Sequence, residues 1–483
     1  MEKKNIWIVG IIVLLLVLVC CCAVLIISGV AAAILMPQAS SQSTIEIIES
    51  EEPPVREPIT LPTLALPGDE NDDNGSSAIP SEQSIDPDIL SQMEKIEKEV
   101  EVIRGLPTAN ELDRKTLSQE ELRQRVMEDF FVDYTEEEVR QDALILNLFG
   151  LIERDYDLYE LFVELYSEQI AGFYDDETKE MVVVQGEGFA GPERMTYAHE
   201  YTHALQDAQF DLENGMNLND DFCEQDTEYC AAVTALIEGD ASFTETQWFL
   251  EYSSLKDKQE VLQFYQEYSS PIFDGTPDFL QEDLIFPYLK GLEFVTYLYE
   301  EGGFAAVDQA YRNPPVTTEQ ILHPERYPDD VPVVINLDDF TDFLGDGWEE
   351  IDRNVMGEWY SYLILAKPLN ENWAIPDEEA LIAAEGWGGD QYLVYHHFDN
   401  DEDVMISLSE WDTQVDADEY WTAFTTYAQN RWGNATTSQT NRLVWEIDQQ
   451  AVIISRHANQ VLWIIAPSIS LVEEINSQFP LFD

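Results

Sequence analysis

An uninterrupted apolar run at the start of the chain constrains this protein more than any other feature. Residues 6–36 contain no charged side chain, and Lys3 and Lys4 stand just before them. A helix of this length rises about 46 Å, enough to cross a hydrocarbon core of about 30 Å with some tilt. We therefore expect residues 1–36 to form a single membrane-spanning helix.

The same run predicts how the chain is oriented. A signal peptide has an apolar region of about 7–15 residues, roughly half of this run, and Pro37 with the next two residues makes a poor cleavage site. We therefore expect an uncleaved signal anchor in the cell membrane. Lys3 and Lys4 keep the N-terminus cytoplasmic, so the bulk of the chain lies outside and the lipid bilayer is an expected partner.

Charge excludes one large class of partner. The 483 residues include 96 Asp and Glu against 24 Lys and Arg, a formal charge of −72. Such a chain has no basic surface for a phosphate backbone, so we expect no nucleic-acid binding. A hydrophobic content of 45% still supplies enough apolar surface for folded domains.

Composition divides the rest of the chain into three parts. Residues 37–90 are rich in Pro, Ser, Asp and Glu, which predicts a disordered stalk. We expect a first, mainly helical domain over residues 91–369 and a second domain over 370–483, because Pro368 and Asn370 mark a boundary. The second domain is predicted to be a small antiparallel α+β domain, with strands near 391–397, 404–409, 443–447, 451–454 and 461–465 and helices near 416–429 and 470–477.

Two cysteines stand outside the apolar run. Cys223 and Cys230 form an even pair in a region expected to face an oxidising compartment, so they can form a disulfide. Zinc binding by the pair is less well supported, because no His or further Cys is near it in sequence.

A β-hairpin and then a helix precede the residues that carry chemistry. Residues 171–174 and 181–184 are hairpin-like. Pro192 and Glu193 then open a helix, with proline in its first turn and an acid at the positive end of the helix dipole.

That helix carries a His-Glu-x-x-His pattern, His199-Glu200-Tyr201-Thr202-His203. Histidines four residues apart project from one helix face and can bind one Zn²⁺, with Glu200 beside the open position of the metal. Zinc lowers the pKa of a bound water to about 7, and a carboxylate can take its proton during attack on a carbonyl. The expected cofactor is therefore Zn²⁺, with Glu200 as general base.

Such a site needs a third protein ligand. The metzincin continuation is absent, because Gln206 and Gln209 stand where Gly and a third His would be. Glu238 is the candidate, with small neighbours that would let its helix approach the first one closely. Asp240 and Glu245, together with Asp207, remain alternatives, either as ligands or as partners of a histidine's second ring nitrogen.

At these residues the chain resembles the gluzincin group of zincin metallopeptidases. The resemblance implies zinc ligands at His199, His203 and Glu238, a general base at Glu200, and a substrate extended along an edge strand, which we place at residues 181–184. The chain also resembles a group of little-characterised bacterial membrane-anchored proteins over most of residues 95–430. The similar segments are 172–175, 199–207, 238–241 and 314–325.

The resemblance also implies a residue that stabilises the developing oxyanion. His323, in a Pro-rich segment, is the candidate catalytic residue, with Tyr288 as its rival. A purely structural role for His323 fits its sequence context equally well. His396, His397 and His457 lie in strand-like segments and are expected to be structural.

Together these features predict an α+β protein with a zincin-type peptidase domain, a membrane anchor and a small C-terminal α+β domain. The expected function is a membrane-anchored, extracytoplasmic zinc endopeptidase acting on a protein or peptide. The alternative is an inactive zincin fold that serves as a surface interaction or adhesion module. The residue patterns leave the substrate and the oligomeric state open.

Overall fold

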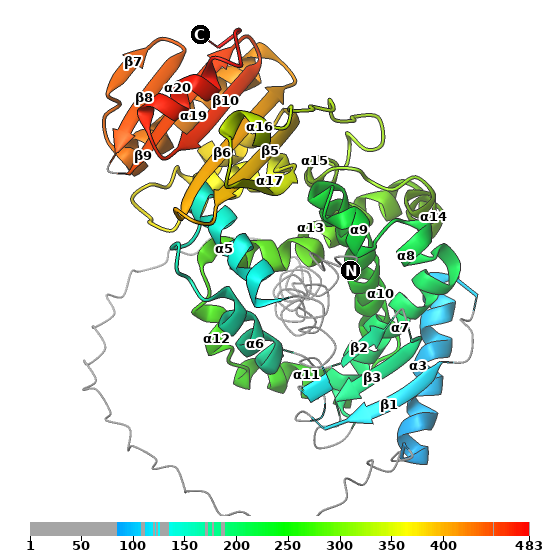
Figure 1. Cartoon of the computed structure of the whole chain (residues 1–483). Coiled ribbons are helices and arrows are strands. Elements are labelled where there is room, and N and C mark those ends of the chain that lie inside the picture. Colours follow the sequence, from blue (N-terminus) through cyan, green and yellow to red (C-terminus); the bar gives the residue numbers. More distant parts are fainter. Residues whose placement is uncertain are drawn as a thin grey trace, which may run out of the picture. The chain divides into compact units, whose positions relative to one another are not determined.

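The computed structural model describes residues 85–482 except 108–111, 119–120, 122–123, 126–134, 170–171, 176–177, 185–188 and 448. The described chain is an α+β protein with a helical part, a three-stranded sheet and a seven-stranded sheet (Figure 1). Its helices are α3 (Pro87–Arg104), α5 (Glu136–Phe149), α6 (Leu158–Gln169), α7 (Gly191–Phe210), α8 (Leu212–Gly215), α9 (Asp220–Cys223), α10 (Thr227–Glu251), α11 (Leu255–Glu267), α12 (Pro271–Asp274), α13 (Asp278–Gly302), α14 (Phe304–Arg312), α15 (Thr318–Leu322), α16 (Thr341–Leu344), α17 (Gly357–Ala366), α18 (Asp377–Ala384), α19 (Gln414–Trp432) and α20 (Ile469–Asn476). Its strands are β1 (Asp113–Leu117), β2 (Gly172–Asp175), β3 (Glu180–Val184), β4 (Trp348–Asn354), β5 (Trp387–His397), β6 (Glu402–Trp411), β7 (Thr437–Gln439), β8 (Arg442–Ile447), β9 (Gln450–His457) and β10 (Gln460–Ala466).

The predicted membrane anchor and most of the predicted stalk lie outside the described residues. Within the described ranges, no helix has the length and apolar character that a bilayer crossing requires. The stalk is predicted to extend to residue 90, whereas α3 already begins at Pro87. The Asp86 side chain caps this helix by accepting a hydrogen bond from the backbone N–H of Asp88, and proline occupies the first turn.

Two long helices, α10 and α13, form the centre of the helical part, and they approach very closely at two glycines. A Cβ on Gly291 would lie 2.0 Å from the backbone oxygen of Ala235, and one on Gly239 would lie 2.2 Å from the Gly291 backbone. The small residues Thr234, Ala235, Ala241 and Ser242 were expected to let this helix approach the motif helix closely. At Ala235 the close backbone approach is instead to α13, through the backbone oxygen that lies against Gly291.

The hairpin before the motif helix is confirmed, but its position in the sheet differs from the prediction. Strand β3 pairs antiparallel with β2 and parallel with β1, so the sheet order is β1-β3-β2. Residues 181–184 therefore lie in the central strand, and the prediction that they form an edge is wrong. Strand β1, a short polar segment, pairs with one side of β3, so β1 and β2 form the two edges of this sheet.

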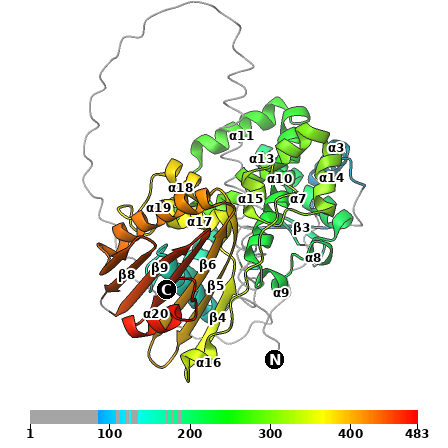
Figure 2. The same cartoon turned by 90° about the horizontal axis from the view of Figure 1, so that it is seen from above.

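The predicted antiparallel C-terminal sheet is confirmed. Seven strands run in the order β4-β5-β6-β10-β9-β8-β7, and every neighbouring pair is antiparallel. Helices α17, α18 and α19 lie on one face and α20 on the other (Figure 2). Successive side chains of β10 point to opposite faces of the sheet. Trp463 packs in the large core shared with the helical part, whereas Leu462 and Ile464 pack in the smaller core with α20.

The predicted domain boundary near residue 370 falls inside this C-terminal part. Strand β4, which no apolar pattern in the sequence predicts, pairs with β5 and joins the same sheet. The junction is also packed, because Tyr427 of α19 donates a 3.0 Å hydrogen bond to the backbone oxygen of Phe149 in α5. The sheet therefore begins earlier than composition indicates, and its core is continuous with that of the helices.

The two cysteines outside the apolar run are bonded. Cys223 of α9 and Cys230 of α10 form a disulfide, as their sequence context predicts. The bond fixes the start of α10, the helix that carries Glu238, to the short helix before it.

Candidate metal centre

The motif helix α7 begins where its sequence predicts and then enters the interior. Pro192 lies in the first turn, and the Glu193 side chain accepts a 3.0 Å hydrogen bond from the backbone N–H of Ala190. Every residue from Met195 to Asp207 is buried. The uncharged flanks of the motif therefore reflect a helix surrounded by protein on all sides.

Both motif histidines converge on a single carboxylate of α10. The Nε2 atoms of His199 and His203 lie 3.1 Å and 3.5 Å from Oε2 of Glu238. All three side chains are buried, and one ligand atom from each lies within 4.8 Å of the others. The third ligand expected from sequence thus lies in the same cluster as the histidine pair.

The opposite ring nitrogen of each histidine is held by another side chain. Nδ1 of His199 lies 3.2 Å from Oε2 of Glu245, and Nδ1 of His203 lies 2.9 Å from Oε1 of Gln206. These contacts orient both rings so that Nε2 faces Glu238, which is how metal-binding histidines are usually fixed. The sequence marks Gln206 only as a departure from the metzincin pattern, although its position three residues after His203 places it on the same helix face.

Asp240 and Asp207, the alternative ligands besides Glu245, have partners other than the motif histidines among the described residues. Asp240 accepts hydrogen bonds from Arg104, Tyr311 and the Gln206 amide, so it supports the residue that holds His203. Asp207 binds Lys179 and the hydroxyl of Tyr174. Among the alternatives, Glu245 therefore contacts the candidate ligand His199 directly, whereas Asp240 contacts Gln206, which in turn contacts His203.

Glu200 is placed to accept and release a proton. Its Oε2 accepts a 2.9 Å hydrogen bond from the backbone N–H of Tyr174 in β2. Within the described part of the chain, its buried Oε1 has no hydrogen-bond partner. Burial raises the pKa of this carboxyl to about 7, although the nearby histidines His203 and His199 act in the opposite direction. A pKa close to neutrality suits a general base.

Glu238 has the opposite electrostatic character. Burial alone would raise its pKa, but positive charge and hydrogen bonds from His203 and His199 lower it to about 2. The pKa values of these two neighbouring carboxyls are therefore shifted in opposite directions, that of Glu238 downward and that of Glu200 upward.

Of the two candidates for oxyanion stabilisation, Tyr288 lies at the histidines and His323 does not contact them. The Tyr288 ring stacks on that of His199 with centroids 6.3 Å apart, and its hydroxyl interacts with Glu238. His323 instead caps α15, and its Nε2 lies 2.9 Å from Oε1 of Glu358. The sequence-based placement of His323 at the catalytic centre therefore has no contact to support it. His323 thus connects the end of α15 to Glu358 of α17, a contact between distant parts of the chain that sequence patterns do not reveal.

The donor set fits a zinc ion. Two ligands that are each about 2.0–2.1 Å from a tetrahedral ion lie about 3.4 Å apart, which is close to the separations between Glu238 and the two histidines. Oε1 of Glu238 is buried and has no hydrogen-bond partner within the described ranges. Two imidazoles and one carboxylate leave a fourth position for water or substrate, as catalytic zinc sites require.

A second group of three carboxylates, Glu319, Asp330 and Asp412, also lies within metal-binding distance of one another. The guanidinium of Arg326 lies among them and forms ion pairs with all three. A protein cation therefore already lies among these carboxylates and offsets part of their charge, so this group gives no independent indication of a metal ion.

Comparison with known proteins gives one match. Residues 344–476 match a family described as a domain of unknown function (DUF8575). This region runs from the end of α16 to the end of α20, so it covers the seven-stranded sheet and excludes His199, His203 and Glu238. No curated protein and no solved structure matches the chain.

Proposed function

We propose that this protein is a membrane-anchored, extracytoplasmic zinc endopeptidase of the gluzincin kind. One observation carries the proposal: His199, His203 and Glu238 converge in the interior with Glu200 beside them. Four polar side chains from two helices are costly to bury unless they bind something. The arrangement of their free atoms matches a zinc site with one open position.

Glu200 and Tyr288 would have different roles in peptide hydrolysis at this site. When bound, zinc supplies a Lewis acid that polarises the scissile carbonyl and acidifies a water molecule. Glu200 takes the proton from that water and passes it to the leaving amine, a transfer suited to its pKa of about 7. Tyr288, through its hydroxyl, is the group available to stabilise negative charge on the carbonyl oxygen.

Strand β2 is the element that would hold the substrate. In an antiparallel strand, the N–H and C=O of one residue point to the same side. Because the N–H of Tyr174 points to Glu200, the outer edge of β2 faces the candidate centre. A peptide that pairs with this edge in extended form would bring a backbone carbonyl to the ligands.

The deciding test compares the full-length chain with Glu200→Gln, both purified in detergent. We expect both to contain about one zinc per chain, and the variant to cleave a broad peptide library about 10²–10⁴-fold more slowly. Zinc is measured by mass spectrometry and cleavage by liquid chromatography. Zinc binding without cleavage by the wild-type chain would reject the peptidase and favour the inactive interaction module.

The anchoring is tested separately. We expect removal of residues 1–36 to move the protein from the membrane fraction to the soluble fraction of the cell, since this segment supplies the apolar length that spans a bilayer. Retention of the shortened chain in the membrane fraction after carbonate washing would show that another segment attaches it.

A further inference from the structure

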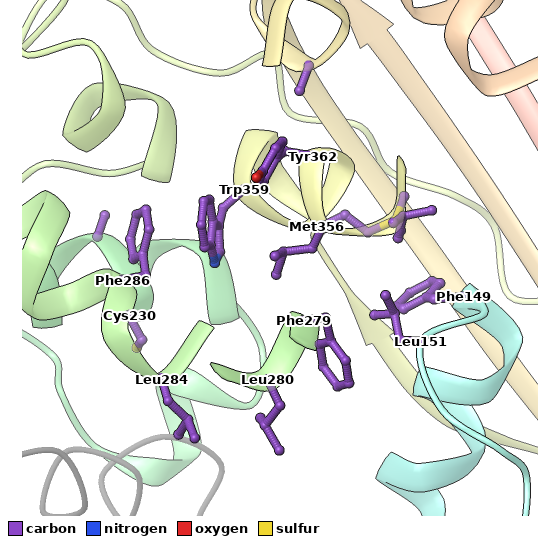
Figure 3. Close-up of a cluster of buried hydrophobic side chains, with 14 of the residues drawn as sticks. Phe149, Leu151, Cys230, Phe279, Leu280, Leu284, Phe286, Met356, Trp359 and Tyr362 are labelled. Carbon is purple, nitrogen blue, oxygen red and sulfur yellow. The ribbon is translucent and has the colours of Figure 1, made fainter. Parts of the chain in front are cut away.

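A cavity of about 130 Å³ lies between the helical part and the seven-stranded sheet. Its walls come from the end of α5, from α10 and α13, and from α17 and β5. Figure 3 labels Phe149, Phe286, Met356 and Trp359, which are among the lining side chains. The main apolar walls are Phe149, Phe286, Tyr288, Met356, Trp359 and Tyr392.

Two residues connect this cavity to the candidate metal centre. Tyr288 lines the cavity, and its ring stacks on His199. Thr234 also lines it and lies one helical turn before Glu238 in α10. The cavity is therefore separated from the metal ligands by the thickness of one side chain.

Thr234 provides a second indication that the cavity holds a ligand. Its side chain is only 3% exposed, and no hydrogen-bond partner reaches its hydroxyl oxygen among the residues the structure describes. A buried hydroxyl without a partner is destabilising, so such groups commonly mark a position that a ligand or water completes.

The two acidic residues that line the cavity do not make it a site for cations. Asp283 accepts hydrogen bonds from the Trp359 indole and the Tyr360 hydroxyl, one on each oxygen. Oε1 of Glu228 accepts two hydrogen bonds from Thr318, and burial raises the pKa of this carboxyl well above its usual value. Protein donors already occupy these carboxyls, and the remaining walls are largely aromatic.

The volume of the cavity limits the size of the group that it can bind. An engineered protein cavity of about 150 Å³ binds one benzene molecule. A volume of 130 Å³ therefore accepts one phenyl ring or one branched aliphatic side chain and excludes two.

We propose that this cavity is the specificity pocket of the protein and takes an aromatic or branched aliphatic side chain, such as Phe or Leu, next to the scissile bond. This inference rests on the proposed peptidase function. It also gives the DUF8575 region a role, because Met356, just before α17, and Trp359 and Tyr360 of α17 form part of the pocket wall. The C-terminal region then takes part in substrate selection.

The first test measures cleavage preference with the zinc-loaded full-length chain. Peptides that differ only at the residues flanking the scissile bond carry Phe, Leu, Ala, Asp or Lys there. We expect the Phe and Leu peptides to have kcat/KM values at least about tenfold above the Ala peptide, and the Asp and Lys peptides to be poorer still. Equal values, or a preference for Lys, would overturn the inference.

Variants of the pocket wall link this preference to the cavity. Ala231→Leu fills space from α10 and should lower kcat/KM for the Phe peptide about tenfold while sparing the Ala peptide. Phe286→Leu removes part of a wall and should improve cleavage of a Trp peptide. Ala305→Leu, at an exposed position of α14, is the matched control and should change neither value. Melting temperatures identify any variant that fails to fold.

A binding measurement separates failure of the pocket from failure of the peptidase. Fluorescence anisotropy with full-length Glu200→Gln, which does not turn over, measures the affinity for the Phe and Ala peptides. A Phe preference that Ala231→Leu abolishes supports the pocket even if the wild-type chain cleaves nothing. Cleavage by the wild-type chain with a preference insensitive to Ala231→Leu and Phe286→Leu would reject the pocket and leave the peptidase intact.

Discussion

The backbone N–H of Tyr174 donates a 2.9 Å hydrogen bond to Oε2 of Glu200, and this bond joins the edge of the three-stranded sheet to the motif helix. It fixes one carboxylate oxygen and leaves the other directed into the interior without a partner in the described region. The strand that would present substrate and the candidate general base are thus held in one geometry. A substitution in β2 is expected to affect catalysis as well as peptide binding.

The first prediction concerns the third metal ligand. Glu238→Gln should retain less than about a tenth of the zinc of the wild-type chain, because the amide carries no charge to balance the ion. Glu251→Gln, at the exposed end of the same helix, is the control and should bind zinc normally. Full zinc occupancy in Glu238→Gln, measured by mass spectrometry, would assign the ligand elsewhere.

The second prediction concerns Glu245, which contacts Nδ1 of His199 at 3.2 Å. Glu245→Gln should keep the site but weaken zinc binding by about 10–100-fold, since groups that orient a ligand histidine contribute on this scale. Competition with a chromophoric chelator measures the affinity. Complete loss of zinc would make Glu245 a ligand, and an unchanged affinity would show that it does not position His199.

The third prediction tests the close approach of α10 and α13. A Cβ at Gly291 would collide with the backbone of Ala235, so Gly291→Ala should lower the free energy of unfolding by about 2–3 kcal/mol or more. Gly302→Ala lies at the end of the same helix, where the added Cβ meets only a side chain, and should cost about 1 kcal/mol or less. Chemical denaturation measures both. An equal loss of unfolding free energy in the two variants would show that α10 and α13 can move apart without loss of stability.

The fourth prediction concerns pH and stability. Burial raises the pKa of Asp390 from 3.8 to about 6 and that of Glu228 well above its usual value. Because the folded-state pKa is the higher one, the protonated form favours folding, and this contribution is lost as pH rises through the folded-state value. The melting temperature should therefore fall between pH 5 and pH 8.

A variant distinguishes this effect from general charge repulsion. Glu228→Gln keeps an oxygen for the two hydrogen bonds from Thr318 but cannot ionise, so its melting temperature should fall less steeply with pH. Glu251→Gln should keep the wild-type slope. Parallel slopes for all three chains would exclude Glu228 as a source of the pH dependence.

Local sequence patterns predicted the elements well wherever the pattern itself reports the environment. The start of α7 followed from Pro192 and Glu193. Strands β5, β6, β8, β9 and β10 followed from apolar runs, whose side chains pack on both faces of the sheet. Strands β4 and β7 were missed because they lie at the two edges of the sheet. Exposed edge strands carry polar residues and lack the apolar signal.

Some residues of the candidate site can likewise be predicted from local sequence patterns, and others cannot. His199, Glu200 and His203 could be assigned because a helix places residues four apart on one face, whatever the rest of the chain does. Glu238 could be proposed from its position in a second helix rich in small residues. Whether Tyr288 or His323 lies near the motif histidines could not be predicted. The local sequence around each residue is compatible with a position at the site, and their distances from α7 depend on how the helices pack.

By itself, the sequence determined the apolar run at the N-terminus, the excess of acid and the local geometry of the histidine pair. Each of these follows from composition or from the fixed period of a single helix. Only the tertiary structure decided that β2 rather than β3 forms the free edge, that Tyr288 lies against His199, and that α17 closes a cavity beside the candidate centre. These relationships join residues more than a hundred positions apart in some cases, and they depend on which apolar surfaces pack together, which local patterns leave undetermined.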